Sequence, residues 1–276
     1  MVSKDQRRRQ LAREKYERQQ QRRSAAQQKT RRRNVIIASV AAVALAAGAA
    51  VYVSAGLAGG SDQEDRAAAP TPSRAPDPCE RPAKGSPSKK TWPKEPAMAV
   101  DTSASYTAKL TTTCGTIGIK LDAGKAPHTV NSFAFLAGQG YFDHSRCHRL
   151  VTDQGLYVLQ CGDPKSTGRG TPGYTIPDEN LKDPRLKGGV YPAGTVAMAN
   201  RYDGTHEKTR DSGGSQFFLV YRDSKLPPNY TPFGTITGGM DILQKIAKAG
   251  AATDPQTGNS APNATVVIDK ASVRKS

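Results

Sequence analysis

From Ser105 onward, apolar and polar residues alternate in short runs that are typical of β-strands. Tyr106, Ala108 and Leu110 alternate with polar residues, and a second alternating run follows after Thr113-Cys114-Gly115. Two such runs separated by a turn predict a β-hairpin. Further short strands are expected between Gly- and Pro-rich loops, in the segments CHRLV, YVLQC, GTVAMAN, SQFFLVY, PFGTI and ATVVIDKASV.

Two segments carry the helical period instead of the strand period. One begins at Pro127 and ends at Gly138, and the other covers Met240 to Ala249; each places apolar residues on one face. Strands and helices do not alternate, so a parallel α/β sheet is not indicated. The pattern predicts a mainly β fold, a closed antiparallel eight-stranded barrel capped by two α-helices.

The N-terminal part of the chain differs in composition. Residues 1–33 hold 13 of the 40 Lys and Arg but only three of the 24 Asp and Glu, so most of the net charge of +16 lies there. Residues 35–58 contain no charge and no Pro, and about 20 apolar residues span a bilayer. We predict a basic cytoplasmic tail at 1–34 and a transmembrane signal anchor at 35–58, oriented by the preceding arginines. A cleaved signal peptide is the alternative.

The next segment, residues 59–103, is predicted to be a semi-extended linker. It holds eight prolines between Pro70 and Pro96 and cannot bury a core. Trp92, the only Trp, is a candidate for docking on the folded domain that we place at 104–276. That domain is then extracytoplasmic, in a single-pass membrane protein. The basic tail fits anionic lipid headgroups better than nucleic acid, so no nucleic-acid partner is expected.

Polar side chains interrupt several of the apolar strand segments. They are His148-Arg149, Gln160, Asn200 and Gln216. Polar groups in such positions are costly unless they are paired. They therefore indicate either internal hydrogen-bond networks or a groove that binds a peptide backbone.

Two other kinds of site are weaker interpretations. His144, Cys147, His148 and Cys161 have a zinc-like composition, but adjacent residues on a strand point to opposite faces and the spacing matches no usual zinc pattern. No metal is therefore predicted. Residues 211–214, Asp-Ser-Gly-Gly, are similar to a serine-protease motif. They lie in a long charged loop, however, and a catalytic triad is defined by geometry.

Taken together, the motifs resemble the cyclophilin-type peptidyl-prolyl cis-trans isomerases. They are YFDHSRCHRL, LQCGDP, GRGTPGY, DEN, GTVAMAN, GGSQFFLVY and TPFGTI, in the family's order across roughly residues 105–274. The tail, apolar span and Pro-rich linker resemble membrane-anchored actinobacterial members. The resemblance implies an enzyme, without cofactor, that accelerates rotation about X-Pro bonds in unfolded or flexible segments of exported proteins. A catalytically weak peptide-binding scaffold at the cell surface is the alternative, and an intact Arg149 favours the enzyme.

The resemblance also assigns the site residues. Arg149 would direct its guanidinium at the prolyl nitrogen, which becomes basic when the amide twists, and His148 would support it without acting as a base. The residues implied for the proline pocket are Val158, Phe218 and Leu226. Those implied for the peptide backbone are Gln160, Ala199, Asn200 and Gln216.

The chain departs from the family's pattern around this pocket. Three extra residues after the catalytic Arg leave Tyr157 or Leu156 at one pocket position, and we choose Tyr157. Leu226 stands where the best-known members carry a Trp that contacts cyclosporin, and Tyr230 stands where they carry a His. Only weak cyclosporin binding is therefore expected. The loop from Arg201 to Gly213 is about seven residues longer than in those members.

Four cysteines, at positions 79, 114, 147 and 161, lie on the predicted exported side, where disulfides persist. Sequence alone does not choose among their three full pairings. Strand parity argues against Cys147–Cys161, because Cys147 should lie on the side of Arg149 and Cys161 on the opposite one. We favour Cys79–Cys114, which would clamp the linker to the domain.

Overall fold

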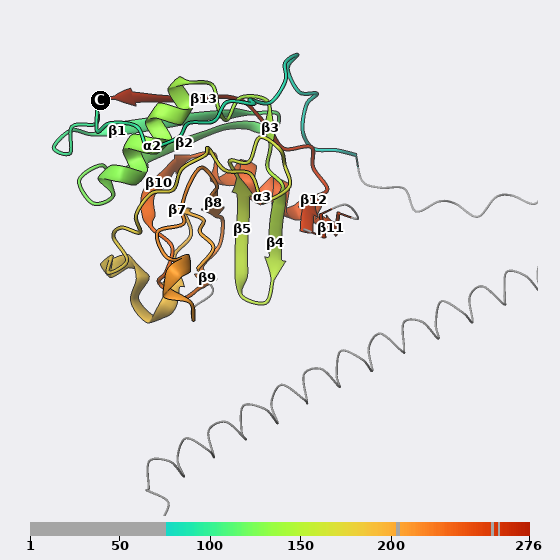
Figure 1. Cartoon of the computed structure of the whole chain (residues 1–276). Coiled ribbons are helices and arrows are strands. Elements are labelled where there is room, and N and C mark those ends of the chain that lie inside the picture. Colours follow the sequence, from blue (N-terminus) through green and yellow to red (C-terminus); the bar gives the residue numbers. More distant parts are fainter. Residues whose placement is uncertain (1–75, 203–204, 255–256, 259) are drawn as a thin grey trace, which may run out of the picture. The chain divides into compact units, whose positions relative to one another are not determined.

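The alternating segments form one curled antiparallel sheet of nine strands in the computed structural model, which describes residues 76–202, 205–254, 257–258 and 260–276 (Figure 1). The strands are β1 (Tyr106–Thr112), β2 (Gly115–Leu121), β3 (Ser145–Arg146), β4 (Arg149–Asp153), β5 (Leu156–Cys161), β7 (Thr195–Met198), β8 (Phe217–Val220), β10 (Pro232–Gly238) and β13 (Val267–Lys275). Their order in the sheet is β3-β13-β1-β2-β10-β7-β8-β5-β4. The predicted hairpin is confirmed as β1 and β2.

The prediction of a closed eight-stranded barrel needs correction. The expected strand at CHRLV is interrupted, because residues 147 and 148 lie between β3 and β4 and belong to neither. β3 pairs with β13 and β4 pairs with β5, so the two short strands form the two edges of the sheet. Among the described residues no ladder joins these edges. The mainly β class is confirmed, as a curled antiparallel half-barrel.

The two predicted helices are confirmed as α2 (Pro127–Gly138) and α3 (Met240–Ala249). Pro127 stands in the first turn of α2, where the missing N–H costs nothing. α2 packs against β13 and α3 against β2, through the apolar faces that the sequence indicates. Short elements complete the domain: the 3₁₀ helices η1 (Pro184–Gly189) and η2 (Glu207–Thr209), and the strand pairs β6 (Val190–Tyr191) with β9 (Ser224–Lys225) and β11 (Ala251–Thr253) with β12 (Ser260–Pro262).

Strands β5, β7 and β8 are buried on both faces, which explains why their sequences are continuous apolar runs. One face joins the main core inside the sheet, through Leu159, Val196 and Leu219. The other face forms a second, smaller cluster made of Val158, Leu186, Tyr191, Ala197, Phe218 and Val220. This second cluster is the floor on which the candidate site is built.

Residues 76–103, the described part of the predicted linker, lie along the surface of the domain without helix or strand. We call them the strap. Trp92 is docked there as expected, with its ring 5.1 Å from Phe135 and 5.8 Å from Tyr141 between centroids. The predicted tail at 1–34, the predicted span at 35–58 and the first part of the predicted linker lie outside the described residues. Within the described ranges, no helix is both long enough and apolar enough to cross a bilayer.

The four cysteines form two disulfides, Cys79–Cys114 and Cys147–Cys161. Cys79–Cys114 is confirmed, but Cys147–Cys161 is also bonded, so the parity argument against it is wrong. The reason is the interruption before β4. The N–H of Cys147 donates to the carbonyl of Val266 at 2.9 Å, outside the β4 ladder, and the side chain turns into the main core beside Cys161. The bridge also removes both sulfur ligands from the zinc interpretation.

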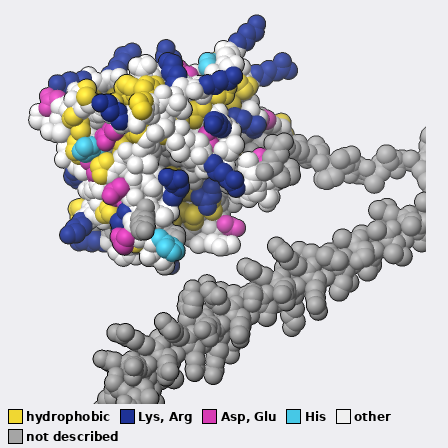
Figure 2. All heavy atoms as spheres, viewed as in Figure 1, with side chains coloured by type: hydrophobic (Ala, Val, Ile, Leu, Met, Phe, Trp, Pro, Cys, Tyr) yellow, Lys and Arg dark blue, Asp and Glu magenta, His cyan; other side chains and the backbone are white. Residues whose placement is uncertain are grey.

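The surface charge of the domain is mixed. On the face shown in Figure 2, Lys and Arg side chains are spread among Asp and Glu and do not gather in one stripe. This distribution agrees with the composition, in which most of the net charge of +16 belongs to residues 1–33. The domain is therefore only mildly basic.

Candidate active site

Two adjoining cavities form the candidate site, and the first of them lies over the second apolar cluster. The first has a volume of about 320 Å³ and is lined by His148, Arg149, Leu156, Val158, Gln160, Gly168, Ala199, Asn200, Phe218, Leu226 and Tyr230. Nine of the eleven predicted site residues are among them. The second cavity has a volume of about 390 Å³ and includes a tenth, Gln216. Gln160, Gly168, Ala199 and Asn200 line both cavities, so the two form one continuous groove.

The floor of the first cavity is apolar and rigid. Val158 and Phe218 are at most 5 % exposed. The ring of Phe218 meets that of Tyr230 edge-on, with 5.5 Å between centroids. Tyr191 fixes Tyr230 in turn, because its hydroxyl donates to the Tyr230 carbonyl at 2.8 Å and accepts from the Tyr230 N–H at 3.1 Å. Leu226 completes the rim, so the cavity fits a compact apolar ring.

Arg149 lies at the edge of this apolar floor, and a chain of amides orients it. The β4–β5 register sets it opposite Gln160, and its Nη1 donates to Gln160 Oε1 at 3.2 Å. Gln160 Nε2 donates to Gln216 Oε1 at 2.9 Å, and Gln216 Nε2 donates to the Gly170 carbonyl at 3.0 Å. Among the described contacts only one of the five guanidinium donors is used. The rest of the fork is available to a ligand.

His148 lies beside Arg149 in the first cavity but is 5 % exposed. Neither ring nitrogen has a hydrogen-bond partner among the described residues. Burial lowers the pKa of His148, the nearby Arg149 lowers it further, and Asp163 opposes both effects. The imidazole is therefore neutral at neutral pH, which fits the predicted supporting role.

Asn200 is at the predicted place, but its side chain is engaged within the protein. Its amide donates to the Asn229 carbonyl at 2.7 Å and to Asp178 Oδ1 at 3.1 Å, and its Oδ1 accepts from the Tyr202 N–H at 3.2 Å. The preceding residue, Ala199, donates its N–H to the Gln216 carbonyl at 2.8 Å. Asn200 therefore braces the wall of the groove, and its amide is already satisfied.

The choice of Tyr157 for the pocket is wrong, and Leu156 takes its place. Leu156, Val158 and Gln160 share one face of β5 and line the first cavity. Tyr157 is on the other face, 6.0 Å from the ring of Tyr221. Strand alternation counted back from Gln160 would have given this result.

The sequence assigns no role to the loop with the motif GRGTPGY, residues 168–174. In the structure, Gly168 of this loop lines both cavities. Buried Asp163 holds this loop by accepting from the N–H groups of Lys165, Thr167 and Gly170 at 2.8–3.0 Å. Burial alone would raise the pKa of Asp163, but these hydrogen bonds outweigh it and lower the pKa. A Cβ at Gly170 would overlap the carboxylate, which explains the glycine.

The serine-protease interpretation finds no support in the loop that suggested it. Ser212 Oγ donates to the Thr209 carbonyl at 2.5 Å and accepts from the Arg201 N–H at 2.9 Å. The hydroxyl thus closes the Arg201–Gly213 loop on itself.

Comparison with known proteins agrees with this geometry. The sequence model of the family described as cyclophilin type peptidyl-prolyl cis-trans isomerase matches residues 107–273, which is more than half of the chain. The chain belongs to the cyclophilin family. The match includes every residue of the groove and begins after the strap.

Curated relatives of this cyclophilin include two mycobacterial proteins. One is named probable peptidyl-prolyl cis-trans isomerase B, from Mycobacterium leprae, and is 48% identical over 171 residues, covering 59% of this chain and 56% of the relative. Its Mycobacterium tuberculosis counterpart is 47% identical, with 59% and 53% covered. The chain thus spans about half the length of these relatives. A Cryptosporidium parvum cyclophilin structure superposes with a TM-score of 0.49 and 24% identity, covering 62% of this chain and 99% of that one.

Proposed function

We propose that this chain catalyses the cis–trans isomerisation of X-Pro peptide bonds. The observation that carries the proposal is the half-buried guanidinium of Arg149, held by Gln160 at the rim of an apolar cavity floored by Val158 and Phe218. The barrier to this rotation is about 18–20 kcal/mol and comes from amide resonance. A catalyst has only to favour the twisted amide over the planar one, and no proton needs to move.

The geometry can supply that preference. The proline ring enters the first cavity, and the flanking peptide runs along Gln160, Ala199 and Gln216 into the second. In the twisted state the prolyl nitrogen becomes pyramidal and its lone pair becomes a hydrogen-bond acceptor. The free donors of Arg149 then bind the lone pair and weaken the resonance that resists rotation. A planar fork that is always charged suits this role better than the point charge of Lys.

The first test is turnover of a short X-Pro peptide in a protease-coupled assay with the full-length chain. The proposal predicts acceleration that is proportional to enzyme concentration and far above the spontaneous rate, which has a time constant of tens to hundreds of seconds. Saturable peptide binding without acceleration would favour the peptide-binding scaffold instead.

We further propose that the substrates are X-Pro segments of exported proteins, with the domain tethered outside the cytoplasm. The support is the sequence of residues 1–58, and the two disulfides, which suit an oxidising compartment. A reporter that is active only outside the cytoplasm, fused after Ser276, is expected to be active and to fractionate with membranes. Deleting Arg31 to Arg33 should scramble the orientation. Recovery of a soluble form that starts near residue 56 would instead establish a cleaved signal peptide.

Cyclosporin is expected to bind weakly. Leu226 lines the first cavity and offers no indole N–H to a ligand carbonyl, and an unmet polar group costs about 1–3 kcal/mol. We expect affinity at least about tenfold below that of Trp-bearing members, partly restored by Leu226→Trp. Calorimetric titration of both proteins decides the matter, and nanomolar binding by the unsubstituted chain would contradict the prediction.

A further inference from the structure

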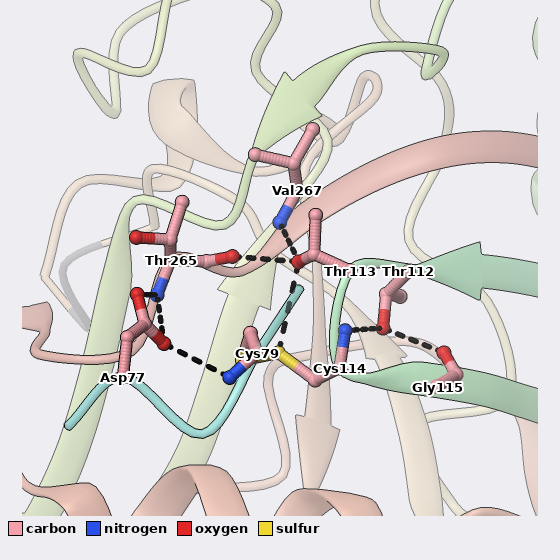
Figure 3. Close-up of a disulfide and its surroundings, with 8 residues drawn as sticks. All are labelled: Asp77, Cys79, Thr112, Thr113, Cys114, Gly115, Thr265 and Val267. Atoms are coloured by element: carbon pink, nitrogen blue, oxygen red, sulfur yellow. Dashed lines mark hydrogen bonds between the residues drawn. A yellow bond between two sulfur atoms is a disulfide. The ribbon is translucent and has the colours of Figure 1, made fainter. Parts of the chain in front are cut away.

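The strap, residues 76–103, is fastened to the domain at its N-terminal end. Cys79 is bonded to Cys114, in the turn between β1 and β2. Figure 3 shows the carboxylate of Asp77 beside this bridge, accepting from the Cys79 N–H at 3.0 Å and from the Thr265 N–H at 2.9 Å. This end of the strap is therefore bonded covalently to the turn between β1 and β2, and by hydrogen bonds to the segment before β13.

The other end of the strap is bound to helix α2. Asn131 is 2 % exposed, and its Oδ1 accepts from the Ala99 N–H at 2.8 Å. Its Nδ2 donates to the carbonyls of Pro96 and Ala97 at 3.2 and 3.1 Å. The Val100 N–H also donates to Oδ1, at 3.3 Å. One buried amide thus bonds four strap residues, so the strap is an ordered part of the domain although it lies outside the residues that match the family.

Between these two ends, Trp92 touches the segment that walls the groove. Its backbone N–H donates to the Pro172 carbonyl at 2.8 Å. Gly173 has φ +98° and passes so close that a Cβ there would lie 2.5 Å from the Trp92 carbonyl oxygen. The indole is locked in place by Phe135 and Tyr141, so the backbone contact cannot slide easily.

The contact with Pro172 lies within the groove wall itself. Thr171 and Tyr174, on either side, line the second cavity. Just upstream, the Gly170 carbonyl accepts from Gln216 Nε2 at 3.0 Å, the last bond of the chain of amides that begins at the catalytic Arg. Holding Pro172 therefore holds the acceptor that orients the amide of Gln216.

A second route joins Trp92 to the same amide. The ring of Trp92 packs on Tyr141, whose hydroxyl lies 3.4 Å from Ser215 Oγ. Ser215 immediately precedes Gln216 and is 1 % exposed. Trp92 is thus linked to Gln216 in two ways. Its backbone bonds Pro172, close to the Gly170 carbonyl that accepts from Gln216, and its ring packs on Tyr141, which bonds the residue before Gln216.

We propose that the strap is a working part of the substrate groove and that Trp92 is a positioning residue for the second cavity. The inference rests on the proposed isomerase function for the identity of the ligand, an extended X-Pro peptide. Removing the indole loosens the Pro172–Gly173 segment, so the groove binds the residues that flank proline less well. Among the described contacts the strap makes none to Arg149 or to the apolar floor, and it reaches Arg149 only through Gln216 and Gln160, so the effect on the proline site should be smaller.

The test compares the full-length chain with Trp92→Ala and Trp92→Phe, well below the melting temperature of each. Trp92→Ala keeps the backbone N–H that donates to Pro172 but removes the ring packing that fixes this backbone. It is expected to raise the peptide KM and Kd about fivefold, through weakening of about one neutral hydrogen bond in the groove, with kcat changed less than about twofold. Trp92→Phe keeps an aromatic ring to pack against Phe135 and Tyr141 and should stay near the unsubstituted values. Lys90→Ala is the matched control, because Lys90 Nζ bonds the Gln139 carbonyl at 2.8 Å, away from the groove. A purely structural strap predicts no change in KM or Kd for any folded variant, and that result overturns the proposal.

A binding readout and a substitute variant make the outcome of the experiment decisive. Kd is measured by NMR titration on the side-chain amides of Gln160 and Gln216, so binding is read even if the unsubstituted chain has no turnover. Binding without turnover overturns the proposed function, whereas an unchanged Kd in Trp92→Ala overturns the strap proposal. If Trp92→Ala does not fold, Gly173→Ala disrupts the contact between Gly173 and the Trp92 backbone from the groove side. It is expected to raise Kd by a similar factor.

Discussion

Replacing Arg149 with Ala is expected to lower kcat/KM for X-Pro isomerisation about 100-fold or more, because removing one preorganised donor to a transition state has effects of this size. The loss should fall mainly on kcat, since the lone pair that Arg149 binds develops only as the amide twists. The melting temperature should change little, because the side chain is half-buried and has a single hydrogen bond within the protein. Steady-state kinetics and thermal unfolding of the same preparation measure both effects.

Two controls separate the role of Arg149 from its charge. Arg149→Lys keeps the charge but not the fork, and we expect it to remain poor. Arg222→Ala removes an arginine that stacks 4.6 Å over the Tyr157 ring, on the other face of β5, and should leave kcat/KM within about twofold. Unchanged turnover in Arg149→Ala would disprove the mechanism.

The same account predicts a flat pH profile. No group donates or accepts a proton during rotation. The pKa of His148 is lowered from the ordinary value of about 6.5, so this side chain is neutral at any pH above 6.5. We expect kcat/KM to vary little between about pH 6 and 9. A bell-shaped profile that disappears in His148→Gln would instead show acid–base catalysis.

Removing the Cys147–Cys161 bridge is the second change with a large expected effect. The bridge closes a sequence separation of 14, and loop-closure entropy predicts a loss of about 3 kcal/mol in the free energy of unfolding for Cys147→Ala with Cys161→Ala. Cys147 is two residues from Arg149, and Cys161 is next to Gln160. The bridge joins the chain just before β4 to the end of β5, near the place where no ladder closes the sheet. We therefore expect kcat to fall as well, in protein that is still folded.

The other bridge provides a matched control. Cys79–Cys114 closes a separation of 35, so Cys79→Ala with Cys114→Ala should cost slightly more stability, about 4 kcal/mol. It does not touch the groove, and Trp92 and Asn131 still hold the strap. Denaturant unfolding and kinetics on both double variants test the difference. Equal losses of kcat would show that the bridge at Cys147 acts only through stability.

Much of the fold could be predicted from sequence because local patterns determine it. The β1–β2 hairpin alternates strictly around a turn, and α2 begins at Pro127 with a helical apolar period, so both were predicted close to their observed bounds. Gln160 was singled out because an amide interrupts the apolar run of β5, whereas Val158 and Phe218 were assigned by the resemblance to the family; the structure places all three in the groove. These features depend on neighbours in the chain, which the sequence displays directly.

The misplaced features depend on distant parts of the chain. The parity argument for Cys147 assumed a continuous strand, but its N–H bonds to Val266, which no local pattern reveals. The strap has no period and no apolar run, and its order comes from a buried amide at Asn131 and an aromatic site for Trp92. Tyr157 is different, since alternation along β5 was sufficient to exclude it and was not applied.

The measurement that tests the central claim most directly is two-dimensional NMR exchange on a short X-Pro peptide, with catalytic amounts of the full-length chain. The account predicts exchange cross-peaks between the cis and trans forms with the unsubstituted chain, and their loss with Arg149→Ala although the peptide still shifts the Gln160 and Gln216 amides. Exchange that is equally fast with both proteins, or absent with both while the peptide binds, would contradict the account.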